Sequence, residues 1–141
     1  MTLHRLLSGK GGSVPEVHAD ATLQEVIDQL ELQDVGTLVV TDGRRRVLGM
    51  MSEREIARGL KTFGRDVVEK PVRELMSRTV VTCDASEPVS TVLRLMDAHQ
   101  IPHVPITRGG VVCGIIDMHD IVKYRLDAID AVASALKAPA P

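Results

Sequence analysis

The chain has 141 residues, of which 44% are hydrophobic and 26% are charged, and this composition fits one compact domain or two closely packed half-size units. Its net charge of −2 provides no basic field for a phosphate backbone, and with one Phe, one Tyr and no Trp it lacks the aromatic platforms on which single-stranded bases stack. The composition therefore argues against a nucleic-acid partner.

The first half of the chain is expected to contain a strand, a helix, two further strands and a second helix. A helical or irregular lead-in over residues 3–8 ends at the glycine-rich residues 9–13. Apolar residues spaced i, i+3, i+4, i+7 between 23 and 30 then predict an amphipathic helix. Two strands joined by a hairpin turn follow, and the second runs straight into a helix. These strands are expected at 37–41 and 47–51, and the helix at 53–60.

The second half repeats this order about 66 residues later. A connector over 61–70 and a short helical turn over 72–76 precede it, and the apolar stripe of the first helix recurs between 89 and 96. Strands are expected at 103–107 and 111–116, and the last helix at 118–136. Units this small are marginal alone, so we expect the halves to share a core. The predicted bounds are 8–63 for the first repeat, 64–71 for a linker, and 72–136 for the second repeat with its C-terminal helix.

This β-α-β-β-α repeat resembles the CBS domain, and the tandem pair resembles a Bateman module of the stand-alone bacterial type. The resemblance covers roughly residues 10–125 and is carried by 49–56 (GMMSEREI), by 114–121 (GIIDMHDI) and by 72–82, which leads into the second half. It implies an α+β fold in which two repeats pack about a pseudo-twofold axis. It also implies a regulatory, signal-transducing module rather than an enzyme. Such a module would bind AMP, ATP, NAD(H) or S-adenosylmethionine in the cleft between its repeats.

The ribose site that this resemblance implies is a Ser/Thr-x-x-Asp segment where the last strand of a repeat meets the following helix. A carboxylate there can accept hydrogen bonds from both ribose hydroxyls. The first repeat has Ser52 and Glu55 at these positions, and the second has Asp117 and Asp120. Either pair could instead only cap its helix, since Ser52-x-x-Glu55 fits a capping box. Asp117 would repel a phosphate, which could favour a nucleoside, a cationic sulfonium ligand or a metal-bridged phosphate.

Further candidates for ligand contact lie near these carboxylates or where the base could sit. His103 begins a strand, and it could contact ligand or hydrogen-bond across the repeat interface. Pro102 stands where related sequences often have Arg, which removes one phosphate contact. Cations such as Lys10 and Arg58 could neutralise a phosphate or belong to a solvated face. The remaining predicted ligand contacts are Arg54, Val80, Thr82, Val104 and Lys123.

The sequence shows no arrangement typical of catalysis, a metal site or a resident cofactor. Neither cysteine matches a metal-ligand spacing, and the five histidines show no paired ligand spacing. The N-terminus lacks the apolar core of a secretory signal, and no stretch approaches the roughly 20 apolar residues that span a bilayer. We therefore expect a cytoplasmic protein with no membrane partner.

Two protein partners remain open from the sequence. The resemblance implies a homodimer, whose interface could come from apolar residues on the helices that end each repeat. The same residues also suit the intramolecular core, and they are Ile56, Leu60, Phe63, Val122, Leu126 and Ile129. An alternative function is a scaffold with degenerate ligand sites that acts by contact with an unidentified regulated protein.

Overall fold

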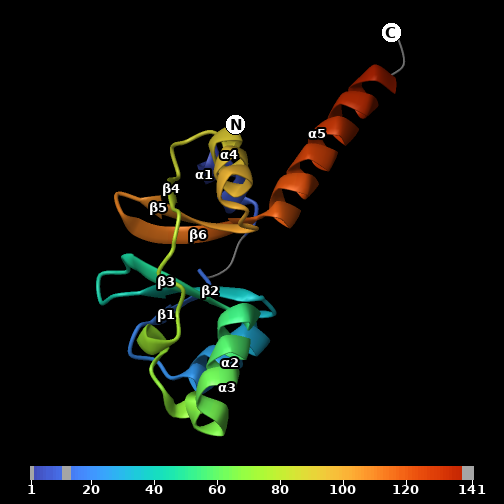
Figure 1. Ribbon diagram of the computed structural model, residues 1–141. Helices are drawn as coiled ribbons and strands as arrows, with labels where there is room; N and C mark the ends of the chain where they lie inside the picture. Colours follow the sequence, from blue (N-terminus) through green and yellow to red (C-terminus); the bar gives the residue numbers. More distant parts are fainter. Residues whose placement is uncertain (1, 11–13, 138–141) are drawn as a thin grey trace.

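The computed structural model describes residues 2–10 and 14–137. Two three-stranded sheets lie face to face in the middle of the molecule, and helices cover their outer sides (Figure 1). The first sheet contains β1 (Glu16–His18), β2 (Thr37–Thr41) and β3 (Val47–Ser52), and the second contains β4 (Cys83–Asp84), β5 (His103–Arg108) and β6 (Val111–Asp117). In each sheet the first strand is parallel to the second and the second is antiparallel to the third. The predicted duplication is thus confirmed at the level of topology.

The helices occur in the predicted order, with modest changes at their ends. The α-helices are α1 (Leu3–Ser8), α2 (Leu23–Gln33), α3 (Glu53–Phe63), α4 (Val89–His99) and α5 (Met118–Lys137). Helix α3 runs three residues beyond the predicted end and stops at Gly64, whose φ of 70° favours glycine. The connector therefore begins inside a helix and continues as a 3₁₀ helix, η1 (Gly64–Glu69), followed by η2 (Val72–Glu74). The glycines at 11 and 12 lie outside the described residues.

Three apolar clusters hold the molecule together. One lies between the first sheet and α2 and α3, and another lies between the second sheet and α1, α4 and the start of α5. The third joins the two sheets and includes Val39, Val112 and Ile115, which are all buried. The N–H of Val112 also donates to the carbonyl of Arg45 at 3.0 Å. The two repeats therefore share a core, as their small size requires.

The segment that leads into each repeat packs on the other repeat. Leu3 and Leu6 of α1 lie in the core of the second repeat, and the Leu3 N–H donates to the Glu87 carbonyl at 3.0 Å. Val72 of η2 lies in the core of the first repeat, and its N–H donates to the Ala21 carbonyl at 2.8 Å. The predicted repeat bounds follow the order of the sequence. In the structure, however, each lead-in segment packs in the core of the repeat that it does not precede.

Helix α5 differs from the other helices in its surroundings. Its first turn packs on β6, and the rest projects beyond the sheets (Figure 1). Ile121 is buried at its base, whereas Leu126, Ile129, Val132 and Leu136 are more than half exposed. Within the described ranges, no helix combines the length and apolarity needed to cross a bilayer.

Candidate ligand-binding site

Both predicted carboxylate pairs lie at the junction of a last strand and the following helix. Ser52 ends β3 and is the N-cap of α3, and Asp117 ends β6 just before α5. Backbone N–H groups at the start of a helix are free to meet an anion or a side-chain oxygen. The two junctions are equivalent in the fold, but their carboxylates have different surroundings.

In the first repeat the carboxylate is turned into its own helix cap. Glu55 is only 7% exposed, and its Oε2 accepts the backbone N–H of Ser52 at 2.9 Å. The Ser52 hydroxyl donates to the same oxygen. Ser52 and Glu55 therefore form the capping box that the sequence offered as the alternative to ligand contact, and this carboxylate oxygen already has two local donors.

In the second repeat the two aspartates cap the helix reciprocally. The N–H of Asp117 donates to Asp120 Oδ2 at 2.9 Å, and the N–H of Asp120 donates to Asp117 Oδ1 at 2.8 Å. Asp120 Oδ2 also accepts the Lys10 ammonium at 2.7 Å. Burial disfavours the charged carboxylate, but the Asp117 N–H and Lys10 outweigh it and hold the pKa of Asp120 below its usual value. Asp120 is therefore anionic at neutral pH.

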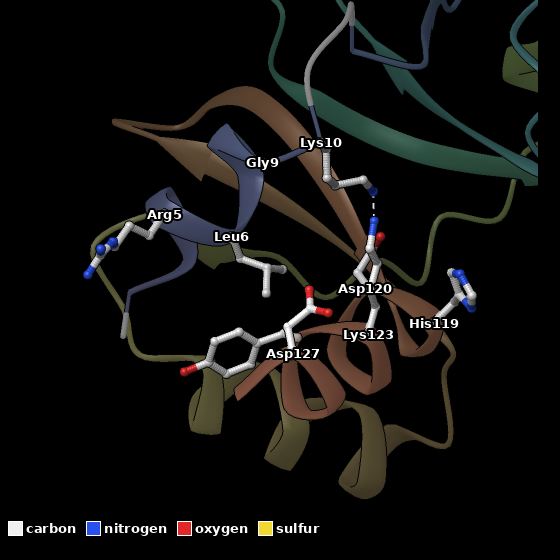
Figure 2. Close-up of a pocket in the computed structure, with 9 residues that line it drawn as sticks. Arg5, Leu6, Gly9, Lys10, His119, Asp120, Lys123 and Asp127 are labelled. Atoms are coloured by element: carbon white, nitrogen blue, oxygen red, sulfur yellow. Dashed lines mark hydrogen bonds and ion pairs between the residues drawn. The ribbon is translucent and has the colours of Figure 1, made fainter. Parts of the chain in front are cut away.

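Lys10 reaches this carboxylate from the opposite end of the sequence. It follows α1, and α1 packs on the second repeat, so the lysine crosses directly to the start of α5 (Figure 2). Its ammonium donates both to Asp120 and to the carbonyl of Ile115, each at 2.7 Å. The sequence marked Lys10 only as one of several cations. Its partner could not be predicted, because the packing of α1 on the second repeat was unknown.

Two cavities meet at Lys10. The first, of about 400 Å³, lies between α1 and α5, and its lining is mostly charged (Figure 2). The second, of about 630 Å³, lies between the repeats, and it is lined mainly by residues with apolar side chains together with Ser8, Lys10 and Gln33. Both volumes are in the range of small-molecule sites. The first is lined by Arg5, Leu6, Gly9, Lys10, His119, Asp120, Lys123, Tyr124 and Asp127. The second is lined by Leu7, Ser8, Lys10, Val14, Pro15, Gln33, Val35, Cys113, Gly114 and Ile115.

Several of the predicted ligand contacts gather on this side of the molecule. Lys123 lines the first cavity together with Asp120. His103 lies opposite Asp117 in the β5–β6 ladder and is partly buried. Asp117, Asp120 and Lys10 are all close enough to act on the charge of the His103 ring.

The other predicted contacts lie elsewhere. Val104 is fully buried in the core of the second repeat, so its side chain reaches no surface. Val80 is partly buried and Thr82 is exposed, in the irregular stretch before β4. Arg54 is exposed on α3, next to the first-repeat pair. The sequence missed the apolar cavity wall, because Val14, Pro15 and Val35 come from the repeat that does not carry Asp120.

His103 is expected to make stability depend on pH. Burial, with a smaller contribution from Lys10, holds the pKa of His103 below its ordinary value, although Asp117 and Asp120 oppose this. Below about pH 6.5 the unfolded chain then holds more protons than the folded chain, so stability falls as pH falls toward the folded pKa. We expect His103→Gln to flatten the decline of the urea midpoint between pH 7 and 5. The exposed His119→Gln is the control, and equal slopes in the wild type and His103→Gln would contradict the assignment.

Comparison with known proteins identifies the repeat. The sequence model of the CBS domain matches residues 13–62 and 72–127. A CBS domain-containing protein of Bacillus subtilis is 30% identical over 123 residues, which are 87% of this chain and 86% of that protein. A CBS-domain protein structure from Agrobacterium tumefaciens is 30% identical with a TM-score of 0.78, over 89% of this chain and 99% of the other. A CBS domain protein from Pyrobaculum aerophilum, complexed with AMP, is 24% identical with a TM-score of 0.74, over 85% and 89% of the two chains.

Several curated relatives are longer than this chain. It spans between 34% and 66% of the length of three of them, at 22% to 29% identity. The family match places a CBS domain over each half of the chain and adds no enzyme domain. The matched region is therefore a tandem module of a kind that also occurs within larger proteins.

Proposed function

Because the chain belongs to the CBS-domain family, we propose that it is a regulatory module that binds an adenosine-containing molecule between its repeats. AMP, ATP, NAD(H) and S-adenosylmethionine are the candidate ligands, and a cytoplasmic location is part of the proposal. The observation that carries it is Asp120, an anionic carboxylate at the start of α5 that lines a cavity of about 400 Å³. The AMP complex of the Pyrobaculum aerophilum protein, which has the same fold, supports this class of ligand.

The proposed pose follows from the chemistry of the two cavities. The ribose hydroxyls donate to Asp120, because a carboxylate can accept from both. The base occupies the apolar cavity, whose lining includes Val14 and Val35 of the first repeat and Ile115 of the second. A ligand held in this way touches both repeats, so it stabilises one packing of the repeats over others. That difference in affinity is what allosteric regulation requires.

Calorimetric titration tests this function. The wild-type chain is titrated with AMP, ATP, NADH and S-adenosylmethionine in turn, and its melting temperature is recorded with and without each ligand. Binding is expected to release or absorb heat and to raise the melting temperature in proportion to the logarithm of ligand concentration. No heat and no melting shift with any of the four at about 1 mM would contradict the proposal. Mass spectrometry of small molecules released on denaturation gives an independent readout.

The apolar face of α5 supports a second proposal, that two copies of the chain form a homodimer. Leu126, Ile129 and Leu136 are 55%, 62% and 81% exposed and lie on one face of the projecting helix. Contiguous exposed apolar surface of this kind marks an interaction site. A second copy presents the same stripe, and a twofold interface is self-complementary by nature. The alternative occupant, a regulated protein, would leave the isolated chain monomeric.

Ile129→Glu is expected to convert the dimer to a monomer, because it places a charge in the middle of the apolar stripe that the dimer would bury. Ala131→Glu is the matched control, since Ala131 is exposed on the opposite side of the same helix turn and should not disturb pairing. Sedimentation velocity at several concentrations measures the mass of each variant. A wild-type chain that stays monomeric at all concentrations would contradict the homodimer.

A further inference from the structure

The Lys10 ammonium donates to the Asp120 oxygen that would accept the hydroxyl groups of the proposed ligand. This ammonium lies 2.7 Å from Asp120 Oδ2, and Figure 2 shows it reaching down to Asp120 from the end of α1. The Asp120 side chain is only 15% exposed, so solvent screens this ion pair less than one on the open surface. Any ligand that places hydroxyl groups on this oxygen must displace the ammonium or share the carboxylate with it.

Lys10 also sets the balance of charge at the site. Three basic side chains line the charged cavity, namely Arg5, Lys10 and Lys123, against the carboxylates of Asp120 and Asp127. Without Lys10, a phosphate in this cavity would meet the Asp120 carboxylate with no ammonium in contact with it. Like charges placed close together oppose binding. Lys10 is therefore the group that makes this acidic helix start compatible with an anionic ligand.

The position of Lys10 allows its ammonium to contact a phosphate of the ligand after it has left the Asp120 carboxylate. The side chain is 38% exposed and lines both the charged and the apolar cavity. A lysine ammonium is a compact charge on a flexible four-carbon stem, so small rotations of that stem carry it between neighbouring acceptors. Because Lys10 lines both cavities, a phosphate bound in either cavity can accept a hydrogen bond from its ammonium.

Resting on the proposed function, we propose that Lys10 is a specificity-determining residue that selects phosphorylated adenosine ligands over the bare nucleoside. When a nucleotide binds, the ribose hydroxyls replace the ammonium on Asp120, and the ammonium moves to the phosphate. One ion pair is exchanged for another, and the hydroxyl–carboxylate hydrogen bonds are gained. A nucleoside breaks the Lys10–Asp120 pair and offers no anion in return. The pair therefore penalises the nucleoside specifically.

Lys10→Met tests the proposal, with AMP and adenosine as the two probes in calorimetric titrations. AMP affinity is expected to fall by less than about tenfold, because the lost contact to phosphate is partly offset by a carboxylate that no longer has to release Lys10. Adenosine affinity is expected to rise, because no ammonium competes for Asp120. The ratio of AMP to adenosine affinity therefore falls roughly tenfold. Lys10→Gln keeps a donor for the Ile115 carbonyl without the charge and should give the same result. Lys10→Arg should restore the preference for AMP.

Lys123→Met is the matched control, since Lys123 lines the same cavity and is not a partner of Asp120 in the described part of the chain. It can weaken AMP, but adenosine affinity should not rise. An unchanged affinity ratio in the folded Lys10→Met and Lys10→Gln variants would overturn the proposal, and so would equal losses for both ligands. A wild-type chain that binds neither AMP nor adenosine would overturn the proposed function and this inference together. Melting curves establish that each variant is folded.

Discussion

Gly49→Ala is expected to lower the free energy of unfolding by about 3 kcal/mol, at the upper end of the cost of overpacking. A Cβ at this position would lie 2.6 Å from the Ser77 carbonyl oxygen and 2.6 Å from Met76 Sδ. The Ser77 carbonyl cannot withdraw cheaply, because it accepts the Met50 N–H at 3.0 Å and the Ser77 N–H donates back to Met50. The added methyl group must therefore separate β3 from the segment that crosses it.

Gly114→Ala is the matched control, because Gly114 occupies the equivalent place in the second sheet. A Cβ there would meet Leu7 Cδ2 at 2.5 Å, which is the end of a flexible and only partly buried side chain. Leu7 can rotate away, so a loss of about 1 kcal/mol is expected. Urea unfolding of both variants measures the difference. Equal losses of unfolding free energy in the two variants would contradict this prediction, because they would mean that the backbone at Ser77 moves aside as easily as the Leu7 side chain.

These two glycines also show why the fold could be predicted so fully. Each lies in the last strand of a repeat, where the lead-in segment of the other repeat crosses. The spacing of apolar and turn residues reflects local requirements of strand, turn and helix, which a sequence displays directly, and the recurrence of a glycine at the same place in each half marks the duplication. The order of elements and the family could therefore be inferred from the sequence.

The site was less predictable because its main contact is not local. Lys10 and Asp120 are 110 residues apart, and they meet only because α1 packs on the second repeat. The sequence placed both carboxylate pairs correctly at helix starts. It offered the capping box of Ser52 and Glu55 as an alternative to ligand contact, but it could not decide between the two roles or show that Asp120 faces a cavity, since these differences depend on burial. Burial also removed Val104 from any surface.

Asp120→Ala is expected to weaken binding of the adenosine ligand by about 100-fold. The variant loses hydrogen bonds from ligand hydroxyls to a charged acceptor, and such bonds contribute about 1.5–3 kcal/mol. A loss of about 2 to 3 kcal/mol corresponds to a factor of roughly 30 to 150 in the dissociation constant. Titration calorimetry with AMP measures this loss, and urea unfolding shows how much stability the same substitution removes.

Glu55→Ala is expected to lower stability while leaving ligand affinity nearly unchanged, and the contrast in affinity with Asp120→Ala tests the asymmetry of the two repeats. Glu55 is buried and bonded to Ser52, so its removal breaks a capping box and should lower the free energy of unfolding by about 1–2 kcal/mol. Ligand affinity should change by less than about threefold, because effects at distant, independent sites do not couple. If Glu55→Ala instead abolishes binding while Asp120→Ala leaves it intact, the ligand occupies the first repeat. A loss of affinity in both variants would mean that both carboxylates act on the bound ligand, and that the buried Glu55 must leave its cap to bind.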